Sequence, residues 1–304
     1  MVNLEIIILS YNTSELTLRA AKSALAIAGA NVTVVDNASV DDTVTTLESL
    51  GKKEKRLKVI ALQDNIGFAG GNNVALREST TPYIMLLNSD AYIEEAKSIE
   101  QLLTYMDEHT EVGIVSPRVN LSNGEIDPAS HRGFPTPWNA FTYYSGLEKL
   151  VTSVPPLNTE VLRAVFGGYH QTWKKKNEIH EVGACTAAAM IIRKKTIDEI
   201  GLLDERFFMY GEDLDWCYRC WKKGWKVVYD PHATVIHDKH SSGLKKKTIP
   251  QNIHAHHIQK RTHHAFYDAM KLFYDKHYRE KYPGFVRSLT FLGISIVEQV
   301  KNKS

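Results

Sequence analysis

The first third of the chain alternates between short β-prone runs and stretches with helical spacing. The β-prone runs occupy residues 4–9, 32–35, 57–62, 83–87 and 112–116, and the segments between them are long enough for helices. Such alternation is typical of crossover connections, which place parallel strands in one sheet with helices on both of its faces. The sequence therefore predicts an α/β domain built on a mostly parallel sheet.

Each of the first four predicted strands ends in a cluster of polar side chains. In an open α/β sheet, these strand ends line the crevice in which a ligand binds. Turn chemistry also favours Asn and Asp, and it explains any single cluster equally well. Four clusters in succession, with carboxylates among them, favour a nucleotide site. The clusters are Ser10-Tyr11-Asn12, Asp36-Asn37, Asp64-Asn65 and Asn88-Ser89-Asp90.

The phosphate-binding fingerprint of dinucleotide enzymes is missing from the sequence. The first strand is followed by Ser-Tyr-Asn-Thr instead of G-x-G-x-x-G, and Gly67, Gly70 and Gly71 have a different spacing and place. We therefore expect a mononucleotide group and not a dinucleotide.

An acidic stretch at residues 207–217 is the strongest candidate for chemistry. Apolar residues from Leu214 onward have helical spacing, and Gly224 can end that helix, which places Glu212 and Asp213 in its first turn. Acidic side chains there complement the helix dipole by roughly 0.3–1 kcal/mol each, which is a purely structural explanation. Carboxylates crowded against aromatic side chains are costly unless they face a cation, a hydroxyl or water. We therefore interpret this stretch as a general-base candidate at the rim of a site.

Composition narrows the class of protein. The chain has 304 residues, a net charge of +2 and three cysteines, which form no disulfide framework and no paired zinc motif. Cys217 and Cys220 are expected in the core, and a reducing compartment is expected for the protein. No run reaches 18 apolar residues, and the apolar run at 4–9 is too short for a signal peptide. A nucleic-acid binder would need a larger positive balance.

The remaining regions are less readable. Prolines and aromatics break residues 120–180 into short elements, which are interpreted either as an inserted substrate-facing subdomain or as packing over the sheet. Beyond residue 240 a basic loop precedes two helices, and the histidines at 254–264 fit a solvated face better than a metal site. The last helix has an apolar stripe, for which packing, dimerisation and attachment to a membrane surface all remain open. The stripe consists of Phe285, Leu289, Leu292, Ile296 and Val300.

Taken together, these motifs resemble the inverting GT-A-fold glycosyltransferases of family 2, and within them the bacterial rhamnosyltransferase-like group. The likeness covers about residues 4–118 and 181–240. It implies a GT-A domain over 1–240, with 120–180 as a variable acceptor-side insertion, and a basic loop with C-terminal helices over 241–304. The motifs that carry the likeness are Ile8-Leu9-Ser10-Tyr11-Asn12, Val34-Val35-Asp36-Asn37-Ala38-Ser39, Asn65-Ile66-Gly67-Phe68-Ala69-Gly70-Gly71-Asn72-Asn73, Leu86-Leu87-Asn88-Ser89-Asp90, the acidic stretch with residues 203–206 before it, and Val235-Ile236-His237.

The resemblance also implies roles for individual residues. Asp213 would be the general base, Tyr11 would flank the pyrimidine, and Asp36 would accept the N3–H of the base. Asp90, in an Asn-Ser-Asp variant of the family's DxD, would bind Mn²⁺ or Mg²⁺ together with His237. The residues implied for nucleotide-sugar binding are Ser10, Tyr11, Asn12, Asp36, Asn37, Asn65, Gly67, Asn72, Asn88 and Asp90. Those implied for acceptor binding or structural support are Glu212, Asp215 and Trp216.

The expected donor is dTDP-L-rhamnose, or otherwise a UDP-hexose, because an Asp contact to N3 recognises thymine and uracil alike. The expected acceptor is a saccharide or lipid-linked saccharide in bacterial cell-surface polysaccharide synthesis. The resemblance therefore implies an enzyme in the cytoplasm. Peripheral contact with the inner membrane face and oligomerisation both remain open, and nucleic acid is not an expected partner. The alternatives are a catalytically silent nucleotide- or glycan-binding module and a sugar-nucleotide pyrophosphorylase. The pyrophosphorylase would need a Gly-rich phosphate loop after the first strand.

Overall fold

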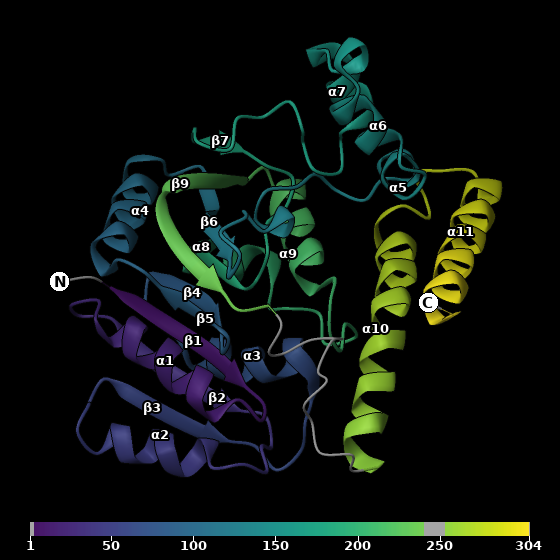
Figure 1. Ribbon diagram of the computed structural model, residues 1–304. Helices are drawn as coiled ribbons and strands as arrows, with labels where there is room; N and C mark the ends of the chain where they lie inside the picture. Colours follow the sequence, from purple (N-terminus) through teal and green to yellow (C-terminus); the bar gives the residue numbers. More distant parts are fainter. Residues whose placement is uncertain (1–2, 240–252, 304) are drawn as a thin grey trace.

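A single mixed sheet forms the centre of the molecule (Figure 1). The computed structural model describes residues 3–239 and 253–303, and the side chains of 253–263 and 301–303 lie outside this description. Within the described residues, the sheet has nine strands in the order β3-β2-β1-β4-β8-β6-β9-β5, with β7 paired to β9. The strands are β1 Leu4–Ser10, β2 Asn31–Asp36, β3 Leu57–Ala61, β4 Tyr83–Asn88, β5 Ala91–Ile93, β6 Val112–Leu121, β7 His180–Glu181, β8 Ala189–Arg193 and β9 Lys226–His237.

The α/β architecture predicted from the sequence is confirmed, and its longest run of parallel strands comes from residues 4–88. Strands β3, β2, β1 and β4 are all parallel, so their carboxyl ends meet at one edge of the sheet. Strand β8 runs antiparallel to both β4 and β6, while β6 and β9 are parallel. Because Leu87 near the end of β4 pairs with Ala189 at the start of β8, the residues just before β8 reach the same edge.

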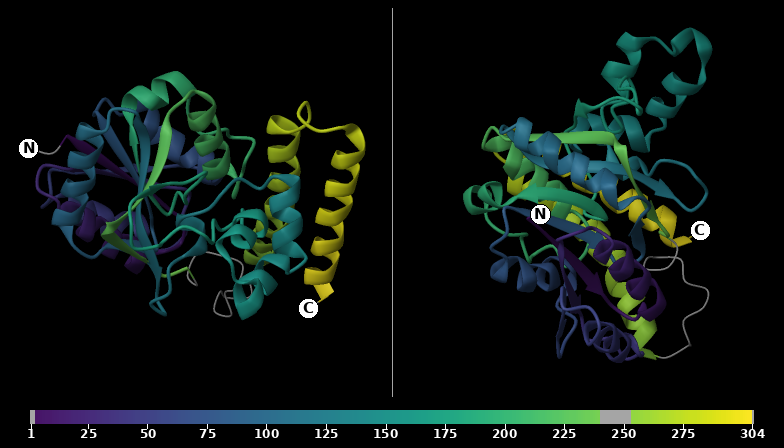
Figure 2. Two further views of the ribbon diagram at one scale, coloured as in Figure 1. Left: turned by 90° about the horizontal axis from the view of Figure 1, so that it is seen from above. Right: turned by 90° about the vertical axis from the view of Figure 1, so that its left-hand side faces the viewer.

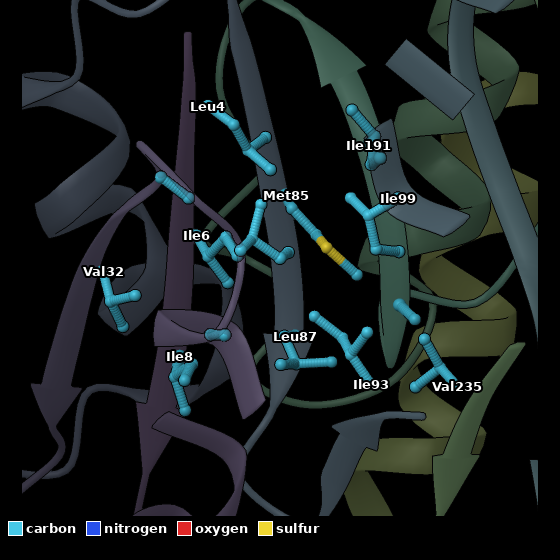
Figure 3. Close-up of a cluster of buried hydrophobic side chains, with 14 of the residues drawn as sticks. Leu4, Ile6, Ile8, Val32, Met85, Leu87, Ile93, Ile99, Ile191 and Val235 are labelled. Atoms are coloured by element: carbon cyan, nitrogen blue, oxygen red, sulfur yellow. The ribbon is translucent and has the colours of Figure 1, made fainter. Parts of the chain in front are cut away.

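Helices cover both faces of the sheet, and β1 shows how the sequence encodes this. Ile6 and Ile8 belong to one buried cluster, with α1 and α4, while Ile7 belongs to another, with α3, α8 and α9. Successive side chains of a strand point to opposite faces, and a strand covered on both sides is therefore apolar throughout. Figure 3 shows the first cluster, in which Met85 and Leu87 of β4 lie beside Ile6 and Ile8. The helices are α1 Ser14–Leu25, α2 Thr43–Gly51, α3 Gly67–Glu78, α4 Ala96–Glu108, α8 Lys194–Ile200 and α9 Glu212–Lys222.

Residues 120–180 contain several short helices, of which α5, α6 and α7 stand away from the sheet (Figure 1). The first of these α-helices begins cleanly, because Thr136 accepts a hydrogen bond from the Asn139 N–H and Pro137 occupies the first helical position. The elements are η1 Pro128–Ser130, α5 Pro137–Tyr144, α6 Leu147–Ser153, η2 Pro155–Leu157 and α7 Glu160–Phe166.

The two predicted C-terminal helices are present as a hairpin, α10 Ile253–His277 and α11 Gly284–Lys303. Figure 2 shows α11 on the outer side of α10, away from the sheet. Helix α10 is held to α9 through the buried Asp215, whose carboxylate accepts hydrogen bonds from His277 Nε2 (2.7 Å) and pairs with Lys276 (2.6 Å). The predicted basic loop at 245–247 and the side chains of the predicted histidine face, except His264, lie outside the described residues.

Candidate active site

A cavity of about 1230 Å³ opens at the carboxyl ends of β1 and β4. It brings together residues that are far apart in the sequence, from the strand ends, the start of α3, the start of α9 and the end of β9. Of the residues singled out in the sequence, the following line it: Ser10, Tyr11, Asn37, Asn65, Gly67, Asn88, Asp90, Glu212, Asp213 and His237.

Three of the remaining candidates support the fold instead of lining this cavity. Asn12, whose φ is 53°, accepts the Val40 N–H at 2.8 Å and so shapes the loop after β2. Asn72 donates to the Phe68 carbonyl within α3 at 2.9 Å. Trp216 is fully buried and donates its indole N–H to the Gly201 carbonyl at 2.9 Å.

Asp36 lies next to Ser10 in the β1–β2 register, just behind the residues that line the cavity. Its carboxylate is almost fully buried, and its Oδ2 accepts the Ser39 N–H at 2.9 Å. Its Oδ1 has no hydrogen-bond partner within the described part of the chain. A buried acceptor without a donor is costly, and an N–H group of a ligand would satisfy it.

The start of the glycine-rich helix α3 is fixed by two asparagines. Asn37 donates to Asn65 Oδ1 at 3.0 Å and to the Gly67 carbonyl at 3.2 Å, and it accepts the Ile66 N–H. Gly67 has a φ of 83°, and a Cβ there would lie 2.5 Å from the Phe208 carbonyl oxygen. Only glycine fits such a close approach, which joins this segment to the loop before α9.

Asp90 and His237 form the part of the site that suits a cation. Both are nearly buried, and Asp90 Oδ1 lies 3.2 Å from His237 Nε2. On the other side of the imidazole, Nδ1 lies 3.5 Å from Oδ2 of the buried Asp127, which also pairs with Lys239 (3.0 Å). Burial works against the charged imidazole, but the two carboxylates raise the pKa of His237 to about 9.

This pair fits a divalent cation of octahedral preference. Two ligands about 2.1 Å from such an ion, at right angles, are about 3.0 Å apart, close to the observed separation. Among the described residues, no group of three or more His, Cys, Asp or Glu side chains could hold a metal ion. The remaining ligands would therefore be oxygens of a bound diphosphate and water, which is the usual arrangement for Mg²⁺.

Asp213, at the start of α9, is held from two sides. Its Oδ2 accepts a hydrogen bond from Arg132 Nη2 at 2.8 Å, and its Oδ1 accepts the Leu214 N–H at 2.7 Å. Burial opposes the charge of Arg132, but the adjacent carboxylate keeps the pKa of Arg132 above its usual value. The pair is about nine-tenths buried on both sides, so the carboxylate is fixed in orientation.

Glu212 and Asp215 flank Asp213 and differ from it in their surroundings. Burial, followed by the charge of Asp213, raises the pKa of Glu212 to about 8, and its Oε2 has no hydrogen-bond partner among the described residues. Burial also disfavours charge on Asp215, but His277, Arg219 and Lys276 lower its pKa below the usual value. Asp215 lies behind the cavity and anchors α10, which makes it a structural residue.

The loop before α9 stores backbone strain beside these carboxylates. Tyr210 has a φ of 71° and Gly211 a φ of 83°, so two successive residues are left-handed. A non-glycine residue in that region costs of order 1–3 kcal/mol and persists only where its surroundings enforce it. Here the enforcing contacts include the Tyr210–Phe266 ring pair with α10, whose centroids are 5.6 Å apart.

Sequence reasoning missed Arg132 and Asp127. Both lie in the segment that was interpreted either as an inserted substrate-facing subdomain or as packing over the sheet, and neither belongs to a run with a readable period. Arg132 reaches the site because its backbone N–H and carbonyl pair with Ala184, just before β8. A lone Arg or Asp in a loop carries no signal of such a tertiary contact.

The chain resembles known proteins in sequence and in fold. The family model described as Glycosyl transferase family 2 matches residues 5–194. The chain is 24% identical over 239 residues to an N-acetylglucosaminyl-diphospho-decaprenol L-rhamnosyltransferase of Mycobacterium tuberculosis, covering 75% of this chain and 72% of the relative. It is 29% identical over 179 residues to the low-salt glycan biosynthesis hexosyltransferase Agl10 of Haloferax volcanii, covering 58% of this chain and 50% of the relative.

Among solved structures, GalNAc-T7 with UDP, GalNAc and Mn²⁺ has a similar fold, with a TM-score of 0.58. The sequence identity is 13%, and the match covers 89% of this chain and 49% of that one. This chain therefore spans about half the length of both GalNAc-T7 and Agl10.

Proposed function

The chain belongs to glycosyl transferase family 2. From this premise, we propose that it is an inverting, metal-dependent enzyme that transfers a sugar from a nucleoside-diphosphate sugar to a saccharide. One observation carries the proposal. The oriented carboxylate of Asp213 and the Asp90–His237 pair line one cavity at the carboxyl edge of the sheet. A transferase needs these two elements within reach of a single substrate pair.

On the donor side, we assign the nucleotide to the strand ends. Tyr11 lines the cavity and would flank the pyrimidine, while the unsatisfied Oδ1 of Asp36 would accept its N3–H. Asn88, whose Oδ1 is also buried without a hydrogen-bond partner among the described residues, would meet the ribose. Asp90 and His237 would hold Mn²⁺ or Mg²⁺, which would neutralise charge on the diphosphate.

On the acceptor side, Asp213 takes the proton of the attacking hydroxyl. The oxygen forms a bond to the anomeric carbon while the bond to the diphosphate breaks, so the configuration at that carbon inverts. Arg132 holds the Asp213 carboxylate in a fixed orientation, which a general base requires before the proton can move. Glu212 lines the same cavity and, at neutral pH, its raised pKa favours a neutral acid that can donate a hydrogen bond to the acceptor.

For the sugar, we propose L-rhamnose from dTDP-rhamnose, and otherwise a hexose from a UDP-sugar. The rhamnosyltransferase of M. tuberculosis supports rhamnose as the sugar, and the hexosyltransferase Agl10 supports a hexose. The pathway we propose is synthesis of a bacterial cell-surface polysaccharide, on the cytoplasmic side of the membrane. No helix in the described residues is long and apolar enough to cross a bilayer.

The experiment is calorimetry of the full chain with dTDP-rhamnose, UDP-glucose and GDP-mannose, each with and without Mn²⁺. We expect a thymidine or uridine donor to bind, and to bind more tightly with Mn²⁺. If no donor binds under either condition, the proposed function is wrong. If a donor binds, the same sample is tested for slow donor hydrolysis, and a complete absence of turnover would favour the silent binding module.

A further inference from the structure

Tyr210 is a cavity residue to which neither nucleotide binding nor proton transfer assigns a role. It is half-buried, lines the cavity together with Asp90 and Glu212, and has its backbone in the left-handed region, at a φ of 71°. In the part of the chain that the structure describes, its hydroxyl forms no hydrogen bond. A tyrosine hydroxyl that is removed from bulk water usually has a partner, and this one faces a cavity that binds substrates.

The loop that carries Tyr210 is clamped on both sides. Before it, the Phe208 carbonyl accepts the Phe68 N–H at 2.7 Å. After it, Gly211 packs so closely that a Cβ there would lie 3.1 Å from the ring of Phe207. These contacts hold two successive left-handed residues in place. Backbone strain of this kind is concentrated where it directs a side chain toward a ligand.

The ring and the hydroxyl of Tyr210 need different explanations. The ring packs edge-to-face on Phe266 of α10, with the centroids 5.6 Å apart and 82° between the planes. Phenylalanine would make the same contact, so packing explains the ring and not the hydroxyl. Glycine or asparagine would adopt the left-handed backbone at lower cost, so the backbone does not explain the hydroxyl either.

The hydroxyl of Tyr210 lies between the two halves of the site. Burial raises the pKa of Tyr210, and the charges of Glu212 and then of Asp90 raise it further. Both carboxylates therefore act on the hydroxyl, which stays protonated and able to donate at neutral pH. Asp90 belongs to the proposed metal and diphosphate site, whereas Glu212 belongs to the acceptor side. A sugar that leaves the diphosphate for the acceptor has to occupy the space between them.

We propose that the Tyr210 hydroxyl forms a hydrogen bond with a hydroxyl group of the sugar that is transferred. The inference rests on the proposed function, and it assigns a residue to the recognition of the sugar itself. A diphosphate oxygen is the weaker candidate for the partner, because Glu212 acts on the hydroxyl more strongly than Asp90 does. A protein group that pairs with a substrate hydroxyl discriminates against the analogue that lacks it, so Tyr210 would help to select the donor sugar.

The first test compares Tyr210→Phe with the unaltered full chain by calorimetry in the presence of Mn²⁺. The probes are dTDP-rhamnose with dTDP, and UDP-glucose with UDP, so that each sugar nucleotide is matched by its nucleotide alone. The variant keeps the ring contact with Phe266 and removes a single oxygen. The control is Tyr143→Phe, because Tyr143 lies on α5, is 41% exposed and does not line the cavity.

We expect Tyr210→Phe to bind the preferred sugar nucleotide about five- to tenfold more weakly, and to bind the matching nucleotide within about twofold of the unaltered chain. Tyr143→Phe should match the unaltered chain with every probe. Equal losses for sugar nucleotide and nucleotide would mean that the hydroxyl does not act on the sugar, and no loss would mean that it binds neither. Either result overturns the proposal. Failure of both sugar nucleotides to bind the unaltered chain would instead count against the proposed function.

A second measurement identifies the sugar hydroxyl. It uses monodeoxy analogues of the sugar nucleotide that binds the unaltered chain more tightly, each of which lacks one hydroxyl of the sugar. We expect one analogue to bind the unaltered chain about five- to tenfold more weakly than its parent, and Tyr210→Phe to bind that analogue and the parent equally. If the losses from the variant and from every analogue simply add, the proposal is wrong even where Tyr210→Phe alone lowers the affinity.

Discussion

The two sides of the cavity are built in different ways. The donor side consists mainly of the ends of β1, β2 and β4, which are brought together by parallel pairing. His237 at the end of β9 reaches it by pairing with Ala91, next to Asp90. The acceptor side consists of the start of α9, an arginine from the insertion and the C-terminal hairpin, which are joined by side-chain contacts such as Arg132–Asp213. Strand pairing therefore fixes most of the donor side, whereas tertiary packing fixes the acceptor side.

This difference predicts that the two sides can be damaged separately. Changes on the acceptor side should impair transfer and leave donor binding intact. Changes on the donor side should impair the binding of metal and nucleotide first. The following predictions test this separation, in order of decreasing effect.

Asp213→Asn should have the largest effect. The amide keeps the size of the side chain but cannot take a proton, so the rate of transfer should fall by about 10²–10⁴-fold. Donor affinity, measured by calorimetry, should change by less than about twofold, because Asp213 is held by Arg132 and Leu214 and not by the nucleotide strand ends. A transfer rate within severalfold of the unaltered chain would exclude Asp213 as the base.

Arg132→Met should have the next largest effect. It removes the partner of a nearly buried carboxylate, and we expect kcat to fall by about 10–100-fold as the base loses its orientation. Donor affinity, measured by calorimetry, should change by less than about twofold, because Arg132 pairs with Asp213 and not with the nucleotide strand ends. Arg132→Lys keeps the charge and should restore part of kcat. A loss of donor affinity as large as the loss of kcat would contradict the positioning role.

Asp127→Asn tests the donor side. Asp127 lies behind His237 and should orient its imidazole toward a metal, as carboxylates behind metal-binding histidines do. We expect the affinity for Mn²⁺ to fall by about 10–100-fold, measured by calorimetry of the chain with UDP. Asp230→Asn is the matched control, since Asp230 is also buried beside a histidine, His232, but lies outside the cavity. Equal losses in both variants would point to a general effect on the fold.

Glu212→Gln should have the smallest effect, and it should depend on pH. The folded pKa of Glu212 is raised to about 8, above the value of about 4.3 expected in the unfolded chain. The folded state therefore holds the proton more tightly, and the unaltered protein loses stability as pH rises between these two values. Gln has no such loss, so in urea unfolding the stability of the variant relative to the unaltered chain should rise by roughly 3 kcal/mol between pH 5 and pH 8. Parallel pH profiles would contradict the raised pKa.

The sequence predicts the donor side because strand ends and polar clusters are both local patterns. The clusters at 10–12, 36–37 and 88–90 lie where the parallel strands end, and most of their side chains line the cavity. Asn12 and Asn72, which were predicted to bind the nucleotide sugar, do not line the cavity and instead satisfy local backbone groups, and this depends on loop geometry.

The acceptor side is predictable only in part, because local patterns encode some of its residues and tertiary contacts bring in the others. Asp213 is readable from a helix start that crowds three carboxylates, whereas Arg132 becomes part of the site through pairing with Ala184. The apolar stripe of α11 was readable from its spacing, but its exposure depends on how the hairpin packs. Long-range contacts leave no period in the sequence. This is why the part of the cavity between α5 and the α10–α11 hairpin could not be foreseen.

The most direct test of the two-sided site is a crystal structure of the chain with UDP and Mn²⁺, with the metal located by its anomalous scattering. The account predicts Mn²⁺ in contact with Asp90 and His237, the diphosphate beside it, and Asp213 still paired with Arg132 and not in contact with the nucleotide. Mn²⁺ bound elsewhere, or coordinated by Asp213, would contradict the separation of donor and acceptor sides.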